Sequence, residues 1–126
     1  MNIISIGFDN LTVKATLNDS PTASEIWSQL PIEARTNTWG DEIFFEIPVN
    51  IPQEPDAREQ VEIGELGYWP VGRAFCIFFG PTPVSKDEKP RAYSPVNIIG
   101  KVLGDFSQLS SIQDGQRVRI ARMDRD

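Results

Sequence analysis

Apolar and polar residues alternate with a period of two along most of the chain, which is the pattern of β-strands that bury one face. Glycine and proline interrupt the alternation where strands must turn, because glycine adopts positive φ angles and proline ends a strand ladder. The alternating runs predict strands at 2–8, 11–17, 65–69, 74–79 and 96–103, with a last one near 117–120. The pattern therefore predicts an all-β fold.

One segment has helical spacing instead. Ser20 suits the N-cap, Pro21 fits the first helical position, and Pro31 would end the helix. The apolar stripe between them consists of Ile26, Trp27 and Leu30. A second, shorter helical turn is predicted at 106–111. About eight strands with one main helix indicate a closed antiparallel barrel or a sandwich, and we favour the closed barrel because it leaves no long exposed edge.

The segment Trp39-Gly40-Asp41-Glu42 has the composition of a two-residue hairpin turn with glycine at its first central position. This turn would fix the register of the flanking strands, pairing Trp39 with Glu42, Asn37 with Phe44 and Arg35 with Glu46. We expect this face, with its ion pair and two aromatic rings, to point outward. The opposite face is apolar enough to be core and consists of Ala34, Thr36, Thr38, Ile43, Phe45 and Ile47.

The composition of the chain restricts the kinds of partner that we expect. A chain of 126 residues, 40% hydrophobic, is long enough for a single domain, 1–126, with its own core. The net charge of −6 repels phosphate backbones, so we expect no nucleic-acid ligand. The basic cluster Arg117, Arg119, Arg122 and Arg125 is interpreted as the solvated face of a last strand. No basic leader and no apolar run of about 20 residues is visible, so we expect a cytoplasmic protein without membrane contact.

The residue types present restrict the chemistry. The sequence has no histidine, which excludes Ser–His and Cys–His nucleophile pairs and histidine metal sites. Cys76, the single cysteine, lies in an apolar run that predicts a buried, unreactive thiol. Glu42 and Glu46 would share a strand face but lie about 13 Å apart at ~3.3 Å per residue, beyond the ~9.5 Å of paired glycosidase carboxylates. We interpret both as solvated strand residues and predict no metal and no cofactor.

Two stretches rich in proline and charge, 48–60 and 85–95, are predicted to be surface loops. The segment Phe79-Gly80-Pro81-Thr82-Pro83 lacks the Lys-Ser/Thr of a phosphate-binding loop, and its prolines remove amide donors that a phosphate would need. We predict that it is a rigid turn at the end of a strand, or alternatively a loop that shapes the rim of a cleft.

The segments Gly64–Pro83 and Trp39–Phe45 resemble a family of small prokaryotic cyclophilin-like barrels of largely unassigned function. The resemblance covers most of the chain and includes 21–31 and 94–101. It implies an eight-stranded barrel smaller than a typical cyclophilin. It does not imply prolyl isomerisation, because the Phe-His-Arg-Val-Ile and Gln-Gly-Gly-Asp segments of true cyclophilins are absent.

We therefore expect a binding module that receives a small molecule or an extended peptide in a surface cleft, without efficient catalysis. The candidate residues are Arg35 as hydrogen-bond donor and Trp39, Phe44 and Tyr68 as apolar walls. An atypical peptidyl-prolyl isomerase is the first alternative, with Arg35 stabilising the twisted imide. The second alternative is an interaction subunit of a larger enzyme, suggested by cyclophilin-like domains in amide-hydrolysing assemblies, which predicts a large exposed apolar patch and a partner protein.

Overall fold

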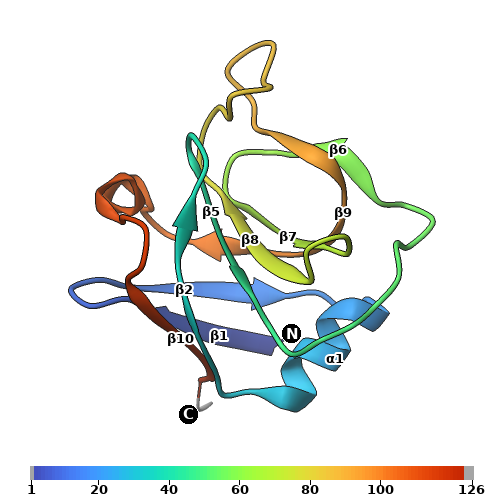
Figure 1. Ribbon diagram of the computed structural model, residues 1–126. Helices are drawn as coiled ribbons and strands as arrows, with labels where there is room; N and C mark the ends of the chain where they lie inside the picture. The colour runs from blue at the N-terminus through green and yellow to red at the C-terminus, as the bar shows by residue number, and fades with distance from the viewer. Residues whose placement is uncertain (1, 124–126) are drawn as a thin grey trace.

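The computed structural model describes residues 2–123 and shows a strongly curved antiparallel sheet with one α-helix at one end (Figure 1). The strands are β1 (Asn2–Gly7), β2 (Thr12–Leu17), β3 (Ile32–Arg35), β4 (Asn37–Thr38), β5 (Glu42–Glu46), β6 (Arg58–Gln60), β7 (Glu65–Trp69), β8 (Ala74–Phe78), β9 (Arg91–Leu103) and β10 (Arg117–Arg122). The helices are α1 (Pro21–Gln29) and the short 3₁₀ helix η1 (Ser107–Ser111). The predicted β-rich fold with one main helix is confirmed.

The main path of the sheet runs β3-β10-β1-β2-β9-β7-β8-β5-β4, and β6 pairs with β9. Its two ends, β3 and β4, follow one another in the chain and are separated by Thr36. Thr36 donates its backbone N–H to the Gln116 carbonyl and accepts the Gly115 N–H, so it is bound to the loop before β10 rather than to β5. Because no ladder joins β3 to β5 within residues 2–123, the sheet is not closed, and the closed barrel that we predicted is not confirmed.

The helix α1 covers one end of the main core. As predicted, the Ser20 hydroxyl accepts the Ala23 N–H at 3.2 Å, Pro21 occupies the first turn, and the helix ends before Leu30. Ile26 and Leu30 are buried in the main core together with side chains from β1, β2, β5, β7, β8 and β10. The predicted helical turn at 106–111 corresponds to η1.

A second, smaller apolar cluster lies on the other face of β7 and β8. Alternation along β8 sends Phe75 and Ile77 into the main core, and Cys76 and Phe78 to this second cluster. The second cluster consists of Val61, Ala74, Cys76, Phe78, Ala92 and Val96. The long strand β9 covers it, because its C-terminal half pairs with β2 and β7 while its N-terminal half pairs with β6.

The strands β6 and β9 correct two of our predictions. The segments 48–60 and 85–95 were both expected to be loops, but the first contains β6 and the second contains the start of β9. The pairing of these two strands is irregular between Arg91 and Val96, and Pro95 lies within that irregular stretch. A proline is tolerated in a strand at such a bulge, and its presence in the sequence therefore concealed the strand.

The last strand agrees in part with the prediction of a solvated basic face. On β10, the exposed Arg117 and Arg119 alternate with the buried Val118 and Ile120. Arg122 is also exposed, but it lies on the same side of the strand as Val118 and Ile120 and donates to the Trp27 carbonyl at 2.8 Å. Arg125 lies outside the described residues. Neither helix within residues 2–123 is long and apolar enough to span a lipid bilayer.

Asn97 is buried where β9 changes from the main sheet to the second cluster. Its Oδ1 accepts the Glu54 N–H at 2.8 Å, and its Nδ2 donates to Thr22 Oγ1 at 3.0 Å and to the Pro52 carbonyl at 3.1 Å. The Thr22 hydroxyl donates in turn to the Glu54 carboxylate. One side-chain amide thus joins α1, the segment before β6, and β9.

We expect Asn97→Ala to lower the free energy of unfolding by about 3 kcal/mol, because it leaves the Glu54 N–H and the Pro52 carbonyl without their partner. Urea unfolding followed by circular dichroism measures this difference. Asn10→Ala, in the exposed turn between β1 and β2, is the matched control and should change stability by less than about 0.5 kcal/mol. An Asn97→Ala variant as stable as the wild type would contradict the importance of this network.

Candidate functional site

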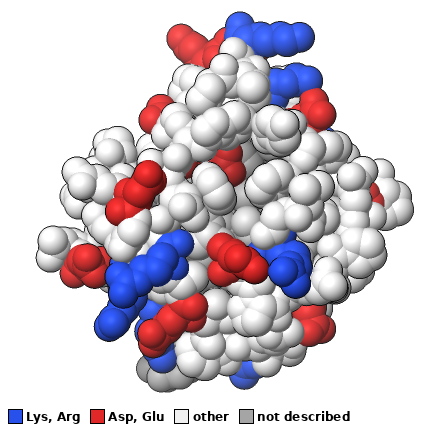
Figure 2. All heavy atoms as spheres, in the orientation of Figure 1, with Lys and Arg blue, Asp and Glu red and all other residues white. Residues whose placement is uncertain are grey.

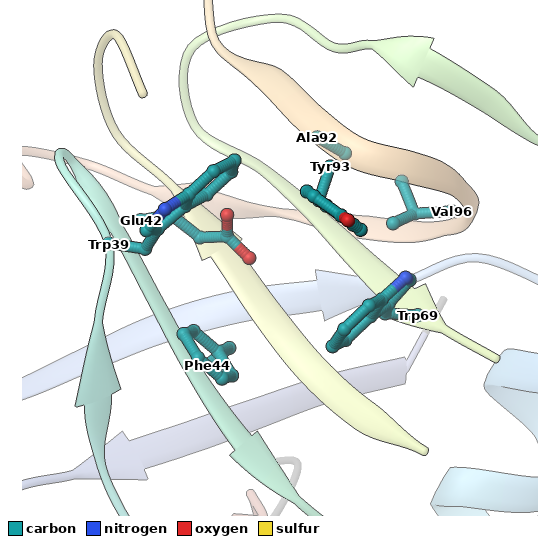
Figure 3. A pocket seen from close by; sticks show the side chains of 7 residues that line it. All are labelled: Trp39, Glu42, Phe44, Trp69, Ala92, Tyr93 and Val96. Atoms are coloured by element: carbon teal, nitrogen blue, oxygen red, sulfur yellow. The ribbon is translucent and has the colours of Figure 1, made fainter. Parts of the chain in front are cut away.

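An apolar pocket of about 280 Å³ lies over the second cluster, between the β4–β5 turn and the start of β9. Its lining residues are Trp39, Glu42, Phe44, Trp69, Ala92, Tyr93 and Val96. Figure 3 shows four aromatic side chains around the opening, with the Glu42 carboxylate directed between them; they are Trp39, Phe44, Trp69 and Tyr93. In the space-filling view the charged side chains of this face surround a hollowed, largely uncharged area (Figure 2).

The turn between β4 and β5 places Trp39 at the pocket. Gly40 has a φ of +59°, and the Trp39 N–H donates to the Glu42 carbonyl at 2.9 Å, which confirms the predicted two-residue turn. A Cβ at Gly40 would lie 2.9 Å from Thr82 Cα, so glycine is required for space as well as for its φ angle.

The segment Phe79–Pro83 holds this turn in place. The Asp41 N–H donates to the Pro81 carbonyl at 2.9 Å, and the Phe79 N–H donates to the Asp41 carbonyl at 2.9 Å. The Thr82 hydroxyl donates to the Arg91 carbonyl at the start of β9. This proline-rich segment therefore joins both sides of the pocket, which supports our alternative prediction of a loop that shapes a cleft.

Trp69 forms the opposite wall. Its indole N–H donates to Ser94 Oγ at 2.6 Å, which fixes the ring against β9. A Cβ on Gly72 would lie 2.5 Å from Trp69 Cε3, so the ring occupies space that only glycine leaves free. The Tyr93 ring lies 6.2 Å from both the Trp39 ring and the Trp69 ring, at interplanar angles of 75° and 80°. Both indole rings thus stand nearly perpendicular to the Tyr93 ring.

Among the residues that line this apolar pocket, Glu42 is the one that carries a carboxyl group. The residue is only 6% exposed, and none of the ion pairs within residues 2–123 includes it. Burial raises the pKa of Glu42 from 4.5 to about 7, and a hydrogen bond from the Cys76 thiol only partly opposes this rise. The carboxyl group therefore changes its charge near neutral pH.

Cys76 lies below Glu42 in the second cluster and is buried, as predicted. Burial, together with the negative charge of Glu42, raises the pKa of the Cys76 thiol well above its ordinary value. The thiol also lies 3.8 Å from the Ala74 carbonyl.

The structure brings together two of the four residues that the sequence suggested. Trp39 and Phe44 line the pocket. Arg35 instead lies in a separate polar groove and donates to the Gly115 carbonyl at 3.2 Å. Tyr68 is fully buried in the main core, where its hydroxyl donates to the Val49 carbonyl and burial raises its pKa. Tyr68 and Trp69 are neighbours on β7 and so point to opposite faces, which is why only Trp69 reaches the pocket.

Two further expectations about this hairpin are wrong. Arg35 does not face Glu46, because β3 pairs with β10 and places Arg35 opposite Arg117. Glu46 pairs with Arg73 instead, at 3.5 Å. The face that carries Glu42 and Phe44 does not simply point to solvent, since β9 and its Tyr93 partly cover it. The predicted pair Asn37–Phe44 is confirmed, and the same register places Thr38 opposite Ile43.

Sequence reasoning missed Glu42, Trp69 and Tyr93 as pocket residues. Glu42 shares a strand face with Phe44, so the hairpin register held a signal for it, but its burial depends on β9. Tyr93 fell in a segment predicted to be a loop, and no local pattern indicated its position. No group of three or more metal-ligating side chains occurs in the part of the chain that the structure describes.

Glu42→Gln tests the buried carboxyl group. Between pH 4.5 and about 7 the folded state binds more protons at Glu42 than the unfolded state does, so its contribution to stability is lost as pH rises through that window. The rise in pKa corresponds to a loss of about 3 kcal/mol. We expect Glu42→Gln to abolish this part of the pH dependence and to be more stable than the wild type above about pH 7.

Chemical denaturation at a series of pH values measures the difference between the two curves. Glu46→Gln is the matched control, because Glu46 lies on the same strand with a side chain that is 70% exposed. Glu46→Gln should leave the loss of stability between pH 4.5 and about 7 unchanged. A wild-type curve parallel to that of Glu42→Gln from pH 4.5 to 7 would show that Glu42 titrates normally.

Comparisons with known proteins find matches that extend over nearly the whole chain. The family model described as Cyclophilin-like matches residues 2–121. Among solved structures, the chain is similar to the solution structure of the hypothetical protein AF2241 from Archaeoglobus fulgidus, with 36% identity, a TM-score of 0.83, and coverage of 97% of this chain and 95% of that chain. No curated protein matches. The resemblance inferred from the sequence is thereby confirmed, and the chain belongs to the cyclophilin-like family.

Proposed function

We propose that this protein is a binding module that receives one small organic group in the pocket between Trp39, Trp69 and Tyr93. The group belongs to a free small molecule or to a side chain of an extended peptide. The observation that carries the proposal is the combination of three aromatic walls with a single inward-directed carboxyl group, Glu42. Apolar pockets with a few placed polar groups are the usual form of ligand sites.

The size of the pocket supports a small occupant. Its volume of about 280 Å³ lies just below the roughly 300–1,000 Å³ typical of small-molecule sites. It is therefore suited to a compact group rather than to a whole cofactor. The turn held by Phe79–Pro83 and the Trp69–Ser94 hydrogen bond keep the Trp39 and Trp69 walls in place, which reduces the ordering needed when a ligand enters.

The chemistry of the lining favours binding without efficient catalysis. A prolyl isomerase needs, besides an apolar pocket, a donor that stabilises the twisted imide. Among the described residues no arginine or lysine lines the pocket, and Arg35, our candidate donor, lies in the separate groove. The Trp69 indole N–H is already engaged by Ser94, so the neutral Trp39 indole N–H and Tyr93 hydroxyl are the side-chain donors left in the lining. These positions favour the binding module over the isomerase alternative.

An NMR titration tests the proposal. The indole N–H signals of Trp39 and Trp69 should shift on addition of compact organic probes, whereas that of Trp27, on α1, should not. The probes are tert-butyl alcohol, which is neutral, an organic ammonium ion and a carboxylate that are both similar to it in size, and an Ala-Pro peptide. Exchange spectra of the peptide should show no acceleration of its cis–trans interconversion.

Two results would contradict the proposal. If no probe of any class shifts either pocket indole, the pocket is not a binding site for groups of this size. If the peptide exchanges faster in the presence of the protein, the isomerase alternative holds instead, despite the absence of an arginine from the lining residues that the structure describes.

A further inference from the structure

We infer that the group received by this pocket is a methylated ammonium ion. This inference rests on the proposed function and specifies the chemical class of the ligand. Three independent features of the pocket favour it: the arrangement of the aromatic rings, the unpaired carboxyl group at their centre, and the small number of hydrogen-bond acceptors in the lining.

The aromatic walls attract cations. The face of an aromatic ring carries negative electrostatic potential, and a cation within about 6 Å of a ring centroid is stabilised by it, most strongly at tryptophan. Here the Trp39 and Trp69 rings each stand nearly perpendicular to the Tyr93 ring, at centroid distances of 6.2 Å. A compact cation between them would contact more than one ring, in the manner of the aromatic cages that bind quaternary ammonium groups.

Glu42 supplies the complementary charge. It is more than nine-tenths buried, its carboxylate is directed into the pocket, and it has no ion-pair partner within residues 2–123 (Figure 3). A buried carboxylate without an ion-pair partner lowers the stability of the folded protein, and a cation bound in the pocket would offset that loss. The net charge of −6 also attracts cations and repels anions.

Because the pocket lining has few hydrogen-bond acceptors, it favours a methylated ammonium ion over an unmethylated one. A primary ammonium has three N–H donors and is strongly hydrated, so burial requires several acceptors. The lining offers the Glu42 carboxylate and the Tyr93 hydroxyl, whereas its remaining side chains are indole donors or apolar groups. A trimethylammonium group has no N–H to satisfy and presents methyl groups to the rings, so it matches this lining better.

Isothermal titration calorimetry with choline and 3,3-dimethyl-1-butanol tests the inference. The two probes have the same shape, but the second has carbon in place of the charged nitrogen. We expect choline to bind at least about tenfold more tightly, because the pocket recognises charge as well as shape. The N-methyl proton signals of choline should also move upfield, because they lie over aromatic rings.

Variants identify the groups responsible. Glu42→Gln should remove most of the preference for choline, and because it is expected to be more stable than the wild type, unfolding would not explain the loss. Glu46→Gln is its matched control and should retain the preference. Trp39→Leu should weaken choline binding, whereas Trp27→Phe, which alters a ring outside the pocket, should not.

The pH dependence gives a further readout. The titratable groups that face Glu42 are the Cys76 thiol from β8 and the Tyr93 phenol from β9, and neither of them acquires a positive charge. Choline affinity should rise by about tenfold between about pH 6 and about pH 8 in the wild type, as Glu42 ionises, and should stay level in Glu42→Gln.

The outcomes separate this inference from the proposed function. Equal affinity for choline and the neutral alcohol overturns the cation inference but leaves the pocket a binding site. Binding of neither probe also overturns it, and the indole titration with the carboxylate and peptide probes then decides whether the proposed function survives. A peptide containing trimethyllysine, compared with choline, assigns the source: tighter binding of the peptide indicates a modified side chain, and tighter binding of choline indicates a free metabolite.

Discussion

The position of β9 in two layers is the constraint on which the pocket depends. Its C-terminal half is part of the main sheet, and its N-terminal half covers the second cluster on the other face of β7 and β8. The buried amide of Asn97, at the point where the strand changes layers, satisfies backbone groups of the segment before β6 and the hydroxyl of Thr22. Without this crossing, Tyr93 and Val96 would not lie above β5 and β8, and Glu42 would face solvent.

The pocket combines local rigidity with an unfavourable buried group. Backbone hydrogen bonds around the Gly40 turn hold the Trp39 wall, and the Trp69–Ser94 contact holds the Trp69 wall, so these two walls are in place before a ligand arrives. The buried carboxyl group of Glu42 lowers stability at neutral pH relative to an uncharged residue. Groups that reduce stability in this way are concentrated at functional sites, where a ligand compensates for them.

The sequence was most informative where structure is local. Period-two alternation located the strands of the main sheet, the Ser20–Pro31 pattern located α1, and the Gly40 turn set the pairing of Asn37 with Phe44. Long-range features were inaccessible to that reasoning. Whether Arg35 pairs with β5 or β10 is decided by the hydrogen bonds of Thr36 to a loop some 80 residues away, and Tyr93 reaches the pocket through an irregular, proline-containing strand. Tyr68 was assigned to the wrong face because register, not residue type, decides which neighbour points outward.

The most direct test of this account is a set of intermolecular nuclear Overhauser effects between the N-methyl protons of tetramethylammonium and the protein at saturation. The account predicts contacts to the Trp39 and Trp69 indoles and to the Tyr93 ring, and none to Trp27. Contacts confined to other residues, or no contacts at all at saturating concentration, would contradict the claim that these three rings and Glu42 form a cation-binding site.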